Sequence, residues 1–341
     1  MHDLLYRPWD VSESDFPTEG KASDKLRFLI NYAVLAPSSH NSQPWLFDIS
    51  GDTLTLYADR TRVLPVMDPH DRELVISCGA ALALLRISMH HFGFADSVQT
   101  FPDPERPDLL ARVNLTAGHD PTPEDDLLFG AILKRHTNRR PYDSRQVPNQ
   151  VVAELEAAAD SEGAQLITVD EEDARNALAL LIAEADRLQW SDKRFRNELA
   201  AWVRPNISVS YDGIQSDALD YGEFTSYTVP QIMRTFDLGN GQAAKDLELA
   251  SGSPLLVVLA TPTDTPTAWL AAGQALAKVL LHTASEGLSA SYLNQPIEIA
   301  SLRKKVQNVT GCDLYPQLVL RMGYGPEVSP TTRRSADTVI I

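Results

Sequence analysis

Three short segments of this 341-residue chain carry side chains that could bind a phosphorylated organic ligand. The first, residues 134–140 (KRHTNRR), combines five basic side chains with the donors of a threonine and an asparagine. Guanidinium groups bind phosphate oxygens through paired N–H bonds, so this composition suits a phosphate group. A second basic pair, Arg333 and Arg334, lies near the C-terminus. The competing interpretations are a solvated charged patch for 134–140, equally good when that segment is taken alone, and a frayed tail for the arginine pair.

The other two segments are polar and directly follow predicted helices. Residues 36–45 (APSSHNSQPW) place short hydroxyl and amide side chains where the backbone leaves a helix and is free to bond a ligand. Residues 287–296 (GLSASYLNQP) begin with a glycine and end in two amide side chains before a proline. A polar turn, with Trp45 anchoring the next strand, is the simpler interpretation of 36–45 when that segment is taken alone.

The chain lacks the common motifs of nucleotide-binding and hydrolytic sites. It contains no GxxxxGKS/T, GxGxxG, GxSxG or HExxH pattern. The eight histidines show no metal-ligand spacing backed by cysteine or aspartate, so we expect no metal site. We interpret His90 and His91 as a pair that caps the end of a helix, and Gly239-Asn240-Gly241 as a plain loop.

Composition and charge exclude several classes of protein. The chain has 46 acidic and 30 basic side chains, a formal net charge of −16, and such a field repels nucleic acid. No uncharged apolar run approaches the roughly 18 residues of a membrane span, and the first ten residues lack the pattern of a signal peptide. Two cysteines provide no disulfide framework. We therefore expect a cytoplasmic protein without nucleic-acid or membrane partners.

The elements that must position the three segments are helices alternating with short strands. Apolar periodicity and capping signals predict helices over residues 23–35, 68–92, 148–159, 173–188, 191–203 and 266–286. Strands are predicted over 54–57, 112–116, 165–169, 255–260 and 318–321. The stretch 78–85 is small and apolar on every side, so its helix must be buried. Residues 204–241 lack a regular pattern, which in a compact domain indicates a disordered stretch or a lid.

An internal repeat relates two of the predicted helices. Residues 78–97 and 272–291 align without a gap at a constant offset of 194 and share six identities, among them Gly79 with Gly273 and Gly93 with Gly287. Two helices rich in small residues can match by composition alone, so chance is the competing explanation. A duplication would let one chain reproduce a two-fold interface that simpler relatives form from two subunits.

Together, residues 20–334 resemble the nitroreductase superfamily of FMN flavoproteins. PSSHNSQPW is similar to the family's helix-to-strand motif, RHTNR to its phosphate-binding arm, and GLSASYLNQP to its flavin-edge loop. DPHDRELVISCGAAL and RHTNRRPYD are most similar to the fused, Acg-like branch. The resemblance implies an α+β fold with mostly antiparallel sheets flanked by helices. It further implies two fused halves, 1–120 and 121–341, forming an intramolecular pseudo-dimer with a lid-like insertion at about 204–241.

The resemblance also implies an FMN site between the halves. The residues expected to bind FMN are Arg135, His136, Thr137, Arg139, Pro37, Ser38, Ser39, Asn41, Asn294, Gln295, Arg333 and Arg334. The first half has only Arg7-Pro8-Trp9 where an arm should be, and the second half has no copy of PSSHNSQPW. Two complementary half-sites make one complete site, so we expect one FMN per chain. No side chain is expected to act as a catalytic group.

The function implied is the NAD(P)H-dependent reduction of nitroaromatics or quinones through bound FMN, with a small molecule as electron acceptor. One alternative is a protein that binds or sequesters FMN under a closed lid and has little or no nitroreductase activity. The third possibility is a structural protein in which these motifs are vestigial. We expect a monomeric pseudo-dimer or a weak homodimer.

Overall fold

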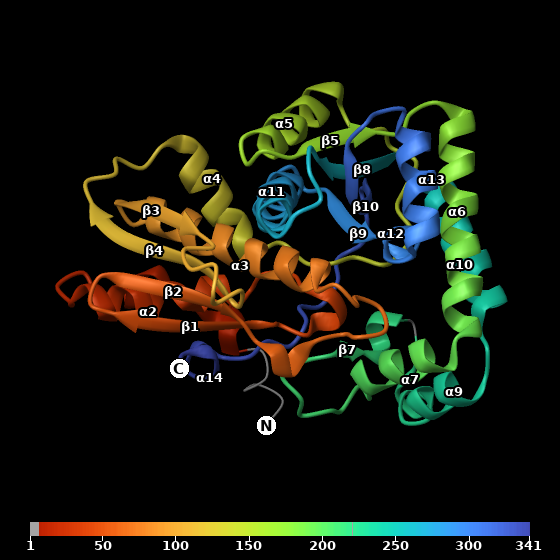
Figure 1. Cartoon of the computed structure of the whole chain (residues 1–341), viewed down its shortest axis with the longest axis horizontal. Coiled ribbons are helices and arrows are strands. Elements are labelled where there is room, and N and C mark those ends of the chain that lie inside the picture. The colour runs from red at the N-terminus through yellow and green to blue at the C-terminus, as the bar shows by residue number, and fades with distance from the viewer. Residues whose placement is uncertain (1–6, 220) are drawn as a thin grey trace.

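The computed structural model describes residues 7–219 and 221–341, and two antiparallel sheets form its framework (Figure 1). The first sheet has the order β1-β2-β4-β3 and the second the order β5-β8-β10-β9. The strands of the first sheet are β1 (Trp45–Ser50), β2 (Thr53–Ala58), β3 (Phe94–Thr100) and β4 (Leu109–Ala117). Those of the second are β5 (Gln165–Thr168), β8 (Leu255–Thr261), β9 (Ser289–Tyr292) and β10 (Tyr315–Gly323). The predicted α+β class with antiparallel sheets is confirmed.

The two sheets repeat one topology. In each, the four strands lie in the chain order first, second, fourth, third. A twenty-residue helix joins the second strand to the third: α3 (Arg72–His91) in the first sheet and α11 (Pro266–Ser285) in the other. The bounds of these two helices differ by the same 194 residues as the sequence repeat.

The helices α3 and α11 cross in the centre of the molecule, between the sheets (Figure 1). A Cβ atom added to Gly79 would lie 3.0 Å from Gly273 Cα, and one added to Gly273 would lie 2.8 Å from Gly79 Cα. Each added atom would also collide with a carbonyl oxygen of the other helix. The repeated glycines are therefore explained by a close approach of two backbones, which only a residue without a side chain permits.

Burial of α3 follows the prediction from its composition. Seventeen of its twenty residues are buried, including the whole stretch 72–85. By length and composition α3 could cross a membrane, but 83% of its apolar window is covered by the rest of the protein, as in a core helix. The helix begins after Asp71, and the carboxylate of Asp68 accepts the N–H of Leu74 at 2.9 Å, so it satisfies one of the free N–H groups of the first turn.

The remaining long helices surround the sheets. They are α2 (Ala22–Ala33), α4 (Pro123–Ile132), α5 (Asn149–Asp160), α6 (Glu172–Ser191), α7 (Lys193–Trp202), α10 (Gly239–Gly252) and α13 (Ala300–Thr310). The predicted helices each appear with bounds shifted by a few residues, whereas β1, β3, β9, α4, α10 and α13 were not predicted. The loop predicted for 239–241 is wrong, because these residues begin α10. Asp237 accepts the N–H of Gly239 there at 2.8 Å, and a Cβ on Gly239 would lie 3.0 Å from that of Trp190 on α6.

The segment 204–241 has more regular structure than its sequence predicts. Strand β6 (Val203–Arg204) pairs in parallel with β7 (Ile214–Gln215), and α8 (Glu223–Ser226) and α9 (Val229–Thr235) follow. Val229 and Met233 pack in a separate apolar cluster with Trp190 and Phe195. The missing periodicity is explained by the shortness of these elements, which bury single side chains instead of continuous faces.

The C-terminal segment returns to the first half of the chain. It contains α14 (Ala336–Val339), Ile340 bridges to Phe47 of β1, and the N–H of Ile341 donates to the Phe47 carbonyl at 2.9 Å. Figure 1 shows the C-terminus beside β1, far from the second sheet in which the chain has just run. This return carries residues 331–334 to the end of α2, where the segment 36–45 begins.

Candidate cofactor-binding site

A cavity of about 800 Å³ lies where segments of both halves meet. It is lined by residues 37–41 after α2, by Thr137 and Arg139, by residues 291–295 after α11, and by Thr331 and Arg333 of the C-terminal segment. Its size falls in the range of ~300–1,000 Å³ typical of small-molecule sites. The three segments singled out in the sequence, 200 and more residues apart at their extremes, therefore meet at one cavity.

Three arginines at this junction have no carboxylate partner in the described part of the chain. Arg135 and Arg333 both donate to the carbonyl of Leu35 at the end of α2, at 3.2 and 3.5 Å, and the Nε atom of each is buried without a partner. Arg139 forms no hydrogen bond or ion pair with any described residue and lines the cavity. Buried cations without counterions are costly, so this arrangement calls for an anion.

Burial favours the neutral form of each ionisable group at this junction, so it lowers the pKa of the arginines and raises that of the tyrosine. It lowers the pKa of Arg135 and Arg139, and together with repulsion from Arg135 it lowers that of Arg333 to about 9. Burial raises the pKa of Tyr292 to about 12 although the same three arginines act to lower it. The Tyr292 hydroxyl is buried and has no partner among the described residues. A bound anion would stabilise the three cations and accept from this hydroxyl.

The segment 36–45 acts as the connector of the site. His40, Asn41 and Gln43 have positive φ angles of 53°, 54° and 53°, which turn the backbone sharply. The Asn41 amide donates to the carbonyls of Thr332 and Gly213 at 3.0 and 3.1 Å, and its oxygen accepts from Arg333 Nη1 at 2.8 Å. Asn41 thus fixes both the C-terminal segment and the base of segment 204–241 against the cavity.

Gln43 is a positioning residue that we did not single out from the sequence. It is fully buried; its oxygen accepts the N–H of Arg334 at 2.7 Å and its amide donates to the Tyr211 carbonyl at 2.8 Å. The sequence feature that could have indicated Gln43 is its position two residues after Asn41 in the same polar motif.

Most of the residues expected to bind a cofactor line this cavity. They are Pro37, Ser38, Ser39, Asn41, Thr137, Arg139, Asn294, Gln295 and Arg333. Arg334 lies outside it, because its guanidinium donates to the Gln43 carbonyl at 3.1 Å and pairs with Asp59 at 3.4 Å. Arg334 therefore secures the C-terminal segment, and Arg333 is the residue of the pair that reaches the cavity.

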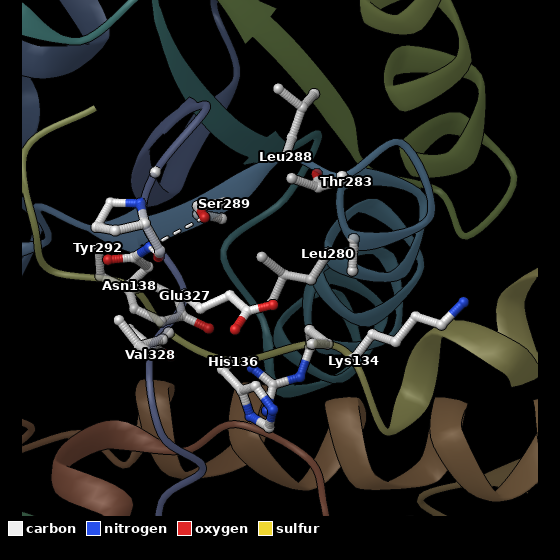
Figure 2. Close-up of a pocket in the computed structure, with 17 residues that line it drawn as sticks. Lys134, His136, Asn138, Leu280, Thr283, Leu288, Ser289, Tyr292, Glu327 and Val328 are labelled. Atoms are coloured by element: carbon white, nitrogen blue, oxygen red, sulfur yellow. Dashed lines mark hydrogen bonds between the residues drawn. The ribbon is translucent and has the colours of Figure 1, made fainter. Parts of the chain in front are cut away.

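Arg135 and His136 line a smaller neighbouring cavity of about 430 Å³, shown in Figure 2. The two cavities share Thr137 and Tyr292. Asn138 fixes the arm between them, since its amide donates to Ser289 Oγ at 3.0 Å (dashed in Figure 2) and its N–H to the Ala290 carbonyl at 3.0 Å. Asn138 lines the smaller cavity, Arg139 the larger one, and Thr137 lies between them and lines both.

Five acidic side chains also line the larger cavity: Glu73, Asp186, Asp237, Asp246 and Glu298. No motif marks them in the sequence, because they lie on α3, on α6, before and on α10, and on the short helix α12 (Gln295–Glu298), and meet only in the folded chain. Glu73 accepts from Ser39 Oγ and pairs with Arg72 at 2.9 Å. The cavity is thus cationic where residues 134–140 enter it and mostly acidic along α6 and α10, where Lys245 also lines it.

The histidines form a cluster that the sequence did not indicate. Ring nitrogens of His90 and His119 and a carboxylate oxygen of Asp125 lie within 4.8 Å of one another. His90 Nε2 lies 3.0 Å from Asp96 and His119 Nε2 lies 2.9 Å from Asp125, so hydrogen bonds satisfy the group. The hydrogen bond to Asp96 raises the pKa of His90, which favours the protonated ring that cannot ligate a metal. The absence of a metal site stays a prediction.

Comparison with known proteins gives full-length relatives. No protein-family model matches the chain. Rv3131 of Mycobacterium tuberculosis strain H37Rv, which carries a provisional name as an NAD(P)H nitroreductase, is 31% identical over 323 residues, covering 93% of this chain and 91% of that protein. The uncharacterized protein Rv3127 of that strain is 32% identical over 330 residues, covering 92% of each. Acg, provisionally named in the same way, is 28% identical over 329 residues, covering 93% and 95%.

Solved structures are more distant. The FMN- and NADPH-dependent nitroreductase NfnB from Sphigopyxis sp. strain HMH is 18% identical, and the match covers 63% of this chain and 97% of the NfnB chain. Its TM-score is 0.41. NfnB from Mycobacterium smegmatis in complex with NADPH is 15% identical, with coverages of 60% and 93% and a TM-score of 0.37.

Proposed function

The chain belongs to the nitroreductase superfamily, and on this premise we propose that it binds one FMN in the larger cavity and is an FMN-dependent oxidoreductase. The observation that carries the proposal is a group of three arginines without carboxylate partners among the described residues, the buried Arg135 and Arg333 and the half-buried Arg139, beside a cavity of suitable size. The FMN phosphate is the anion that these cations lack. When bound, FMN supplies the redox chemistry, and the protein orients it and tunes its surroundings.

The residues divide the binding between them. Arg139, Arg333 and Thr137 would hold the phosphate, with Arg135 and His136 behind them in the smaller cavity. Pro37, Ser38, Ser39 and Asn41 would approach from the first half, and Asn294 and Gln295 from the second. No protein nucleophile or metal is required for this role.

The chain provides one such site. At the offset of 194, Asn294 and Gln295 correspond to Thr100 and Phe101, and Tyr292 corresponds to Val98. Val98 and Phe101 pack against the hydrophobic core of the first half. This loss of polar groups supports one FMN per chain and a single-chain pseudo-dimer whose mirror site is filled. The halves are proposed as 1–120 and 121–341.

Turnover with NAD(P)H and reduction of nitroaromatics or quinones are the activity we propose for this site. Segment 204–241 favours a second candidate, because Ile214, Leu219, Met233 and Leu238 form part of the cavity wall. A wall made by this segment would act as a lid and exclude nicotinamide. The protein would then hold FMN with little or no nitroreductase activity.

An anaerobic titration separates the two candidates. The visible spectrum of the FMN-loaded protein is recorded before and after addition of NADPH, and then after a small chemical reductant. Bleaching of the flavin band by NADPH within seconds is expected for the oxidoreductase. Bleaching by the chemical reductant alone identifies the closed, FMN-holding protein, and failure to bind added FMN contradicts both.

A further inference from the structure

Two buried carboxyl groups of the larger cavity are not used by the phosphate-binding arginines. Asp186 on α6 is 1% exposed and Asp246 on α10 is 5% exposed, and both line the cavity. The donors that reach Asp246 Oδ2 are the amides of Gln295 and Gln242, at 2.7 and 2.9 Å. No donor in the described ranges reaches Asp186 Oδ2, and neither aspartate forms a salt bridge with a described residue.

Two such carboxyls cannot both be ionised. Burial and repulsion between them raise the pKa of Asp186 to about 8, and burial also raises the pKa of Asp246. The charges of Lys245 and Arg321 act in the opposite sense on Asp246, through space. The pair therefore shares one proton at neutral pH and carries one negative charge.

The rest of this wall also accepts hydrogen bonds. The side-chain oxygen of Gln295, whose amide already donates to Asp246, is buried and has no donor among the described residues. Glu298 lines the cavity three residues further on, and its carboxylate accepts from Gln189. A ligand that lies against Asp186, Asp246 and Gln295 meets acceptors and the negative charge of the pair, with Lys245 and Arg321 elsewhere in the cavity lining. A carboxylate would be repelled, whereas an N–H or ammonium group would satisfy acceptors that the protein leaves open.

We propose that the wall formed by Asp186, Asp246 and Gln295 binds the second ligand of the site through an N–H or ammonium group and rejects carboxylates. The electron acceptor is then an aromatic amide or amine, neutral or cationic, and not an aromatic acid. This inference rests on the proposed function, since it assigns the ligand that enters beside FMN. The arginines select the cofactor, and the acids select what reacts with it.

Four aromatic probes of nearly equal shape test the assignment. They are 4-nitrobenzamide, which donates; methyl 4-nitrobenzoate, which is neutral without a donor; 4-nitrobenzoate, an anion; and 4-nitrobenzylammonium, a cation. Each is titrated into the oxidised, FMN-loaded protein at pH 7, and binding is read from the change in the flavin spectrum. The amide and the ammonium are expected to bind about tenfold or more tightly than the anion, with the ester between them. Equal affinities, or no binding by any probe, overturn the inference.

A variant pair assigns the selectivity to the wall. The double variant Asp186→Asn/Asp246→Asn is expected to reduce the preference for the ammonium over the anion by about tenfold, because it removes the charge of the pair and keeps the shape of both side chains. Asp173→Asn, an exposed position on α6, is the matched control and should leave the preference unchanged. An unchanged preference in the double variant contradicts the assignment, and the wild-type series decides the question if that variant fails to fold.

FMN affinity, measured first on the same samples, distinguishes failure of the proposed function from failure of the inference about the wall. Loss of FMN binding by the wild type contradicts the proposed function itself. Normal FMN binding without discrimination among the probes contradicts only the inference about the wall.

Discussion

The two central helices end in different surroundings although they belong to equivalent parts of the same framework. At the end of α3, Arg86 and His90 both bind Asp96, which fills the space with an ion-pair network. The residues of the second half at the offset of 194 are Leu280, Ala284 and Ala290, and all three line the smaller cavity beside the arm.

This difference shows how a repeated fold can carry a single site. The sheets keep the same strand order and the helices keep their glycine crossing. What changed are side chains at the ends of the helices: charged partners close the first half, and small apolar residues leave the second half open to residues 134–140. The framework is thus constrained by the packing of both halves, whereas each potential site can be filled or kept independently.

The largest effect is expected from removing Arg139, a cation of the second half of the chain. Arg139→Ala should weaken FMN binding about 10–100-fold, since a charge-assisted hydrogen bond contributes roughly 1.5–3 kcal/mol. Equilibrium titration followed by flavin fluorescence measures this. Arg112→Ala, at an exposed position of β4, is the control with the same change of charge. If both variants bind FMN like the wild type, the phosphate is held elsewhere.

The shared interface is tested at the glycine crossing. Gly273→Ala should lower the free energy of unfolding by about 1–3 kcal/mol, the usual cost of overpacking a core, because its Cβ would collide with the backbone of α3. Gly130→Ala on α4 places its Cβ in open space and should instead be neutral or stabilising by up to about 1 kcal/mol. Denaturant unfolding compares the two, and equal effects would mean that the helices do not approach closely.

The smallest effect is expected in the first half of the chain, in the ion-pair network of Arg86, His90 and Asp96. Because the hydrogen bond to Asp96 raises the pKa of His90, its stabilisation is fully present below the ordinary pKa of about 6.5 and is lost as pH rises through the higher folded value. His90→Gln should therefore cost about 1 kcal/mol or less at pH 6, and less again at pH 9. His70→Gln, at an exposed position, should show no such trend. A cost that grows with pH would contradict the assignment.

The sequence was sufficient for the parts of the molecule that depend on local patterns. The cationic side of the cavity was predictable because its residues lie in short motifs, and the twenty-residue helices α3, α6 and α11 because their apolar residues extend over several turns. The acidic side was not, since Asp186 and Asp246 are 60 residues apart and are joined only by the packing of α6 on α10. The different roles of Arg333 and Arg334 also needed the structure, because adjacent residues point to different partners.

The most direct test of the account is the stoichiometry of FMN. The protein is loaded with excess FMN, freed of unbound cofactor by gel filtration, and its flavin and protein concentrations are then measured independently. One FMN per chain is predicted, because the arm, the segment 36–45 and Arg333 come together once. A ratio near two would contradict the claim that the first half is filled, and a ratio near zero would contradict the site itself.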